Sequence, residues 1–131
     1  MTILVIEDSF FLRRAIQNLL QKCGHTVTSF PDGRAGLRAA RATLPNVILL
    51  DMMLPGLEGT AVLRQLKKDP LTASIPVVVI SSLPQKNEEQ LKRDGATAYL
   101  EKSALDLDNN SAFLVEAVEK AVRKDLAPAA D

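Results

Sequence analysis

Residues 47–51 have the sequence Val47-Ile48-Leu49-Leu50-Asp51, an unbroken aliphatic run that ends on an acid. Such a run is typical of a parallel strand covered on both faces, because a strand with one solvated face alternates apolar and polar residues. Similar runs lie at residues 3–6 and 77–80, and a weaker one lies at 98–100. The stretch 25–30 is β-branched but more polar, which predicts a strand near an edge of the sheet.

Segments with helical periodicity separate these predicted strands. Apolar residues from Phe11 to Cys23 recur at i, i+3 and i+4, with Ser9 as N-cap and Gly24 as the C-terminal stop. Further helices are predicted at residues 33–41, 59–68, 85–94 and 111–124. Strict alternation of strands and helices, with right-handed crossovers, predicts an α/β fold in which a parallel sheet is sandwiched between helices.

The predicted helices differ in how much apolar surface they offer to the sheet. Residues 85–94 have Leu91 as their clearest apolar residue, so this helix is expected to be the least firmly held. The helix at 111–124 is expected to bury a longer stripe, which consists of Phe113, Leu114, Ala117, Val118, Ala121 and Val122.

Length and composition fit one globular domain. The chain has 131 residues, of which 47% are hydrophobic and 4% aromatic, so the core is expected to be aliphatic. We assign residues 1–126 to the domain and residues 127–131 to a tail or the start of a linker. Lys plus Arg and Asp plus Glu each total 16, so no bulk charge favours nucleic acid or an anionic membrane.

Cysteine and histidine content restricts the kind of metal site and the compartment. Cys23 and His25 are the single residues of their types, so neither an internal disulfide nor a thiolate or imidazole cluster can form. The N-terminus lacks a basic region and turns acidic at Glu7, and no apolar run approaches the roughly 18 residues of a membrane span. These features predict a cytoplasmic protein.

Ionisable and hydroxyl side chains follow four of the predicted strands. Glu7 and Asp8 follow the first, Asp51 the third, Ser81 the fourth, and Lys102 comes just after the fifth. Because the carboxyl ends of parallel strands meet at one edge of a sheet, we expect these side chains to gather there. Taken singly, each has an ordinary structural explanation: Asp8 as a helix cap, Asp51 as a solvated loop acid, Lys102 as a surface lysine.

Taken together, these side chains favour metal-assisted chemistry. Crowded carboxylates repel one another and raise their own pKa values unless a cation keeps them ionised. Hard oxygen ligands without His or Cys favour Mg²⁺, with Mn²⁺ as an alternative. A carboxylate beside Mg²⁺, a lysine and a small hydroxyl suits an Asp nucleophile that accepts a phosphoryl group.

Four stretches of the chain carry a resemblance to a known family. They are residues 4–8, 47–56, 75–81 and 95–102. These stretches, with Ser81 placed 30 residues after Asp51 and Lys102 placed 21 after Ser81, are similar to the receiver domains of two-component response regulators. The resemblance extends from residue 3 to about 122 and implies a flavodoxin-like, doubly wound (βα)5 sandwich with strand order 2-1-3-4-5.

The resemblance implies a role for each residue at the sheet edge. Asp51 is the phosphoacceptor, which takes a phosphoryl group from a phosphohistidine on a sensor histidine kinase or a histidine phosphotransfer protein. Glu7, Asp8 and Asp51 would bind Mg²⁺, together with the main-chain carbonyl of Met53. Lys102 would pair with Asp51 and afterwards with a phosphoryl oxygen.

The resemblance also implies a switch. Ser81 would bond the arriving phosphoryl oxygen, and Tyr99 would turn inward as that hydroxyl withdraws. The change would alter the surface of the fourth helix, fifth strand and fifth helix, to which a downstream protein target or a second copy of the chain would bind. The implied protein is a signalling phosphoacceptor of a two-component system or phosphorelay that assists its own phosphorylation and dephosphorylation. It is not an enzyme, and it contacts neither nucleic acid nor membrane directly.

The first helix commonly docks the phosphodonor in this family. That makes Arg13, Arg14 and Gln17 candidates for donor contact, although a run of charge is more often a solvated helix face. Two positions depart from the family pattern. Glu7 stands where Asp is commoner, and Ser103 follows Lys102 where the family generally has a proline on a cis peptide bond, which leaves the reach of Lys102 open. The connection at 104–110 is longer and more acidic than expected.

Other functions are weighed against this one. Aspartyl-nucleophile phosphatases typically carry a second Asp two residues after the first, where this chain has Met53. A Ser-His-Asp hydrolase is disfavoured because His25 is expected at the opposite end of the sheet from Ser81. A receiver-like interaction module that works without phosphorylation would usually have lost the acceptor Asp, an acid or the lysine, all of which are present.

Overall fold

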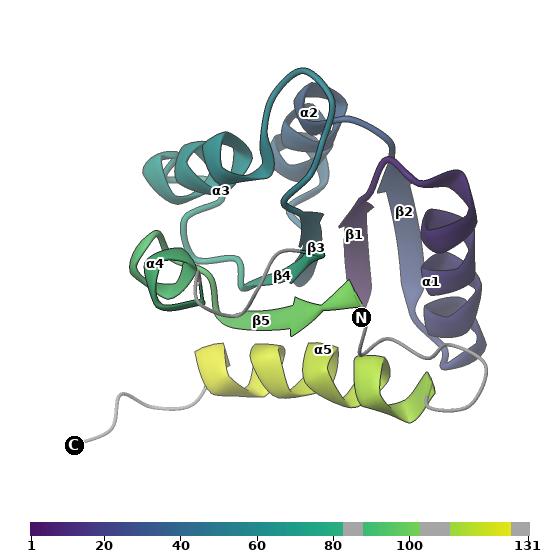
Figure 1. Ribbon diagram of the computed structural model, residues 1–131. Coiled ribbons are helices and arrows are strands. Elements are labelled where there is room, and N and C mark those ends of the chain that lie inside the picture. The colour runs from purple at the N-terminus through teal and green to yellow at the C-terminus, as the bar shows by residue number, and fades with distance from the viewer. Residues whose placement is uncertain (83–87, 103–110, 127–131) are drawn as a thin grey trace.

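A computed structural model describes residues 1–82, 88–102 and 111–126 of the chain. Its centre is a five-stranded parallel sheet with strand order β2-β1-β3-β4-β5, which confirms the predicted doubly wound topology (Figure 1). The strands are β1 (Thr2–Ile6), β2 (Thr26–Phe30), β3 (Val47–Asp51), β4 (Val77–Ser81) and β5 (Ala98–Glu101). The continuous apolar runs β3 and β4 are buried along their whole length, whereas the more polar β2 lies at an edge, as predicted.

Helices cover both faces of the sheet. They are α1 (Phe10–Lys22), α2 (Gly33–Thr43), α3 (Gly59–Lys68), α4 (Glu88–Arg93) and α5 (Ser111–Leu126). Figure 1 shows α1 and α5 on one face and α2, α3 and α4 on the other. Alternate side chains of β1 therefore enter two separate aliphatic clusters: Ile3 and Val5 pack with α1 and α5, and Leu4 and Ile6 pack on the opposite side.

The predicted helix boundaries hold at most ends. The Ser9 hydroxyl accepts a hydrogen bond from the backbone N–H of Leu12 at 3.3 Å and so caps α1, and Gly24 follows α1 with φ +92°. Helix α3 has the predicted bounds. Helix α2 extends two residues beyond the predicted end, to Thr43, before Leu44 adopts a left-handed conformation.

Three residues expected to be buried are exposed. Phe11 is 84% exposed, Phe113 is 38% exposed, and Cys23 is exposed. The buried residues of α1 are Ile16 and Leu20, and Phe11 lies on a different face because its position does not fit the i, i+4 series of this stripe. Phe113 is next to buried Leu114 in α5 and is displaced from it by about 100° around the helix. Cys23 is the C-cap of α1 and lies beyond its packed turns.

Helix α4 is the lightly packed helix that the sequence predicts. Leu91, at 4% exposure, is its buried apolar side chain among the residues described. Residues 85–87 of the predicted helix lie outside the described part of the chain, as do Ser103, the connection at 104–110 and the tail at 127–131.

The strand register places the predicted functional residues at one edge of the sheet. Ile6 pairs with Leu50, Asp51 with Ile80, and Ser81 with Glu101. The residues that follow these pairs therefore emerge side by side at the carboxyl edge, where doubly wound sheets bind their ligands.

Candidate functional site

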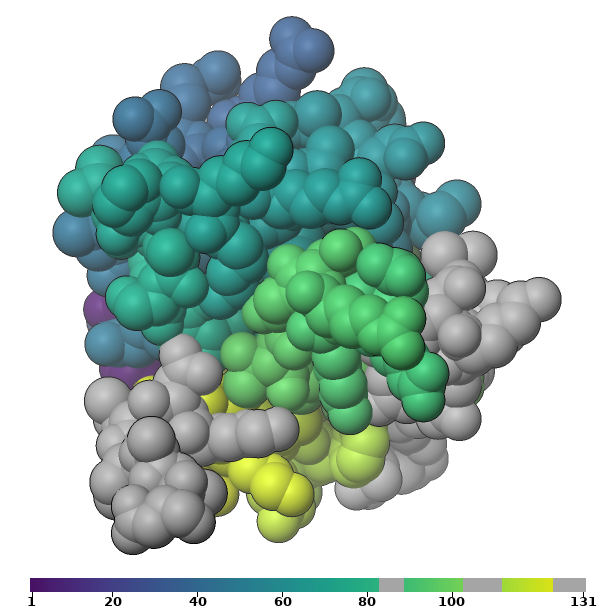
Figure 2. Space-filling model, turned by 90° about the vertical axis from the view of Figure 1, so that its left-hand side faces the viewer, coloured from purple at the N-terminus to yellow at the C-terminus, as the bar shows by residue number. Residues whose placement is uncertain are grey.

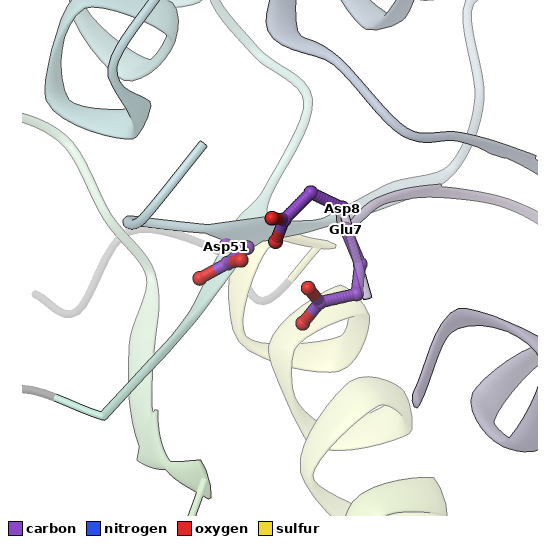
Figure 3. Close-up of side chains that lie close together, drawn as sticks. All are labelled: Glu7, Asp8 and Asp51. Carbon is purple, nitrogen blue, oxygen red and sulfur yellow. The ribbon is translucent and has the colours of Figure 1, made fainter. Parts of the chain in front are cut away.

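Three carboxylates converge at the carboxyl edge of β1 and β3. Each of Glu7, Asp8 and Asp51 offers an oxygen, and these oxygens all lie within 4.8 Å of one another. Figure 3 shows the three side chains turned toward a common space. Glu7 and Asp51 are fully buried, whereas Asp8 is exposed. The cluster is therefore a pocket with two acids at its base and one acid at its mouth.

Glu7 is held by both neighbouring elements. Its backbone N–H donates to the carbonyl of Phe30 at 3.1 Å, which extends the β1–β2 ladder by one residue. Its Oε2 accepts a hydrogen bond from the backbone N–H of Ser9 at 3.0 Å. The pKa of Glu7 is raised to about 7, chiefly because the carboxyl group is buried and also because Asp51 lies nearby; the hydrogen bonds from the Ser9 N–H and from Lys102 act in the opposite direction.

Lys102 bridges the two buried acids. Its Nζ lies 3.0 Å from Glu7 Oε1 and 3.2 Å from Asp51 Oδ2, and 24% of its side chain is exposed. Partial burial lowers the pKa of Lys102, but the hydrogen bond and charge of Glu7, with those of Asp51, outweigh it, so that the pKa is raised above its ordinary value. The ammonium therefore stays charged and compensates part of the negative charge in the pocket.

Asp51 is fixed through both oxygens at the start of the β3–α3 connection. Oδ1 accepts a hydrogen bond from the backbone N–H of Met53 at 3.0 Å, and Oδ2 accepts one from Lys102 at 3.2 Å. Gly59, at the start of α3, makes this arrangement possible, because a Cβ there would collide with the main-chain oxygen of Asp51. The first residue of α3 thus packs against the main chain of Asp51 and Met52.

The oxygen set fits a hard divalent cation. Glu7 Oε1 is buried and pairs with Lys102 Nζ at 3.0 Å, and a carboxylate oxygen has a second lone pair, so this oxygen can also take a ligand. Carboxylates with no sulfur or imidazole nearby are the donors that Mg²⁺ prefers. A groove of about 520 Å³ opens beside Asp8 and is lined by Met53 and Glu58 among others. The pocket is therefore open to solvent from the side of Asp8.

Ser81 and Tyr99 lie on neighbouring strands next to this pocket. Ser81 is fully buried at the end of β4, one residue beyond the pairing partner of Asp51. Tyr99 is 8% exposed on β5 and packs in the cluster that includes Leu91 of α4. His25 lies before β2 at the far edge, where its Nδ1 is 3.1 Å from the N-terminal nitrogen, which excludes a Ser-His-Asp arrangement with Ser81.

The side chains of α1 that are candidates for donor contact also make hydrogen bonds within the domain. Gln17 accepts a hydrogen bond from the Ser29 hydroxyl at 2.9 Å, and Arg13 donates to the carbonyl of Glu7 at 3.0 Å. Phe10 and Phe11 form an exposed edge-to-face pair with ring centroids 5.9 Å apart. Sequence reasoning missed this aromatic pair because it assigned Phe11 to the inner stripe and gave Phe10 no role.

The fold and the site together define a doubly wound α/β domain with a pocket of three acids and a lysine at the carboxyl edge of its sheet. Comparison with known proteins identifies the family. The response regulator receiver domain family matches residues 3–112. The chain belongs to this family, whose members are signalling proteins of two-component systems.

Individual relatives agree with this assignment. The chain is 38% identical to protein PilH of Pseudomonas aeruginosa over 101 residues, which cover 76% of this chain and 84% of PilH. It is 39% identical to the response regulator PleD of Caulobacter vibrioides over 101 residues, but these cover 22% of that longer protein. A response regulator receiver domain protein from Clostridium thermocellum superposes with a TM-score of 0.81 at 29% identity, covering 95% of this chain and 97% of that one.

Among the residues described, none of the helices combines the length and the apolar composition that crossing a bilayer requires.

Proposed function

We propose that Asp51 accepts a phosphoryl group from a phosphohistidine of a sensor kinase or a histidine phosphotransfer protein. The observation that carries this proposal is the pairing of a fully buried Asp51 with Lys102 at 3.2 Å, in a pocket that contains two further acids. An Asp51 oxygen forms a bond to phosphorus while the bond from phosphorus to the donor imidazole breaks. The electron pair of that bond stays on the imidazole nitrogen.

The remaining groups would hold the transferred phosphoryl group. Glu7, Asp8 and Asp51, with the Met53 carbonyl, would hold Mg²⁺, which offsets charge on the phosphoryl oxygens when it is bound. Lys102 lies 3.2 Å from Asp51 Oδ2 and can pair with an oxygen of the phosphoryl group once Asp51 has become an acyl phosphate. Ser81, buried at the end of β4, would donate its hydroxyl to another oxygen. The same groups would assist dephosphorylation, in which a water oxygen bonds to phosphorus while the bond from phosphorus to the Asp51 oxygen breaks, which returns the carboxylate and releases phosphate.

Acetyl phosphate tests this proposal without a partner protein. Incubation with acetyl phosphate and Mg²⁺ should give an acid-stable, base-labile phosphoryl adduct by mass spectrometry, and Asp51→Asn should give none. Asp32→Asn is the control, because Asp32 is not one of the three clustered acids and caps α2 by accepting from the N–H of Ala35, a role that Asn can keep. An undiminished adduct in Asp51→Asn, or no adduct on the native chain, would exclude Asp51 as acceptor.

The surface formed by α4, β5 and α5 would carry the signal to a downstream protein or a second copy of the chain. A cavity of about 350 Å³ lies between these elements, lined by Lys92 of α4, Tyr99 of β5 and Phe113 of α5, with Lys120 at its side. Figure 2 looks toward α4, drawn in green, which adjoins α3 and the yellow-green α5. Tyr99 touches both this cavity and the core beneath α4, so its rotation would change the shape of the surface.

Hydrogen exchange measures this second step. Acetyl phosphate with Mg²⁺ should change exchange in residues 88–101 of the native chain and leave Asp51→Asn unchanged. If acetyl phosphate changed the exchange of both proteins in the same way, the change at this surface would not depend on phosphorylation of Asp51.

A further inference from the structure

The turn that carries Glu7 and Asp8 has an unusual support. Strand β1 ends at Ile6, so the carbonyl of Glu7 lies beyond the sheet ladder, in a residue with no exposed surface. A buried carbonyl in that position needs a donor. Nη1 of Arg13 supplies it at 3.0 Å, across the first turn of α1. A guanidinium therefore replaces the missing backbone partner.

Arg13 is itself held in place from two directions. Its backbone N–H donates to the carbonyl of Ser9 at 2.9 Å, within the turn that also gives Glu7 Oε2 a hydrogen bond from the Ser9 N–H. Its guanidinium lies 5.8 Å from the ring centroid of Phe10. Arg14 differs: its guanidinium lies 5.7 Å from the same ring, but it is exposed, and its described contacts do not include Glu7.

We propose that Arg13 is a positioning residue of the acidic pocket. By fixing the Glu7 carbonyl, it fixes the turn that presents Glu7 and Asp8, so that their carboxylates meet Asp51 around one cation. This inference rests on the proposed Mg²⁺ site.

Electrostatics gives this proposal a test of sign. A positive charge close to a cation site opposes metal binding, so removal of Arg13 as a mere charge would tighten Mg²⁺ binding. Removal of Arg13 as a positioning group would weaken it, because groups that orient metal ligands typically contribute about 10-fold or more to metal affinity. The two roles therefore predict opposite changes.

Calorimetric titration of Mg²⁺ into the full chain distinguishes them. We expect Arg13→Ala to weaken Mg²⁺ binding about 10-fold, Arg13→Lys to recover part of the loss by keeping a charged donor, and Arg14→Ala to leave affinity unchanged or slightly tighter. If Arg13→Ala does not fold, Arg13→Met keeps an unbranched stem against Phe10 and lacks the donor, and the same loss is expected from it.

Failure of this inference is distinct from failure of the proposed function. If the native chain binds Mg²⁺ and Arg13→Ala or Arg13→Met binds it as tightly as Arg14→Ala, Arg13 does not position the site, and the phosphoacceptor proposal is unaffected. If the native chain binds no Mg²⁺, both are overturned.

Discussion

The region from β1 to α3 and the region from α4 to β5 contribute to the same pocket but differ in how firmly they are packed. Helix α3 buries Val62, Leu63 and Leu66 completely, whereas α4 buries Leu91 among its described residues. The acids Glu7, Asp8 and Asp51 belong to the first region. Tyr99 and Lys102 belong to the second or follow directly from it.

This difference separates the fixed groups of the site from the groups able to respond. A charge change at Asp51 acts on acids that are held by strands and by hydrogen bonds from Ser9, Arg13 and Met53. The same change reaches Lys102, which is joined to the lightly packed region. Local stability is low where few apolar side chains are buried, so the second region is the one whose arrangement we expect a small charge change to alter.

The largest test of this contrast removes core side chains from the two helices. Leu63→Ala in α3 should lower the free energy of unfolding by about 2–5 kcal/mol, because its neighbours lie in a packed core and cannot close the cavity fully. Leu91→Ala in α4 should cost about 2 kcal/mol or less, since the short helix can relax toward the space. Urea denaturation measures both. Equal losses would show that α4 is as firmly packed as α3.

The extent of correct prediction follows the same division. Strands β3 and β4 could be predicted because unbroken aliphatic runs have few other structures open to them, and residues after parallel strands necessarily share an edge. The positions of Glu7, Asp8 and Asp51 follow from that rule alone. Their proximity to Lys102 fits the predicted pairing of Lys102 with Asp51, but the ion pair between Lys102 and Glu7 does not follow from strand order.

Other features depend on distances that no local pattern contains. The bond from Arg13 to the Glu7 carbonyl joins a helix to the end of a strand, and nothing in the spacing of these residues distinguishes Arg13 from Arg14. The exposure of Phe11 reverses a prediction made from apolar periodicity, because Phe11 lies on a different face of α1 from the buried Ile16 and Leu20. Sequence reasoning is therefore strongest for elements and weakest for contacts between their ends.

A second test compares acids of the two regions. The pKa of Glu7 is about 7 in the metal-free fold and ordinarily 4.5, so the native state holds this proton more tightly than the unfolded chain does. The stabilising contribution is thus complete below pH 4.5 and is lost as pH rises through about 7. The effect of Glu7→Gln on the free energy of unfolding of the metal-free protein should therefore be more favourable at pH 8 than at pH 5, by about 1–3 kcal/mol.

Glu89 of α4 supplies the control for this substitution. Its side chain is 88% exposed, so Glu89→Gln should leave the pH dependence of unfolding unchanged. At pH 8, saturating Mg²⁺ should make the native chain the more stable of the two proteins, because Mg²⁺ binds the native chain more tightly than it binds the Glu7→Gln variant. Thermal unfolding with and without Mg²⁺ measures both effects. If the stability of the metal-free native chain and that of Glu7→Gln depended on pH in the same way, the raised pKa of the buried Glu7 would be contradicted.

The smallest expected effect concerns the anchor of α4. Arg64 Nη2 of α3 lies 3.6 Å from Asp94 Oδ2, just after α4, and Gln90 Nε2 donates to Asp94 Oδ1 at 3.3 Å. Asp94→Asn should lower global stability by less than about 1 kcal/mol, because Arg64 is largely exposed. It should nevertheless speed hydrogen exchange in residues 88–93, since this end joins α4 to the firmly packed region.

Glu89→Gln is the control, because it breaks the surface-exposed pair with Arg93 and should leave that exchange unchanged. Equal exchange rates in the two variants would mean that the contacts of Asp94 do not hold α4 in place. The two regions would then differ only in how many apolar side chains they bury.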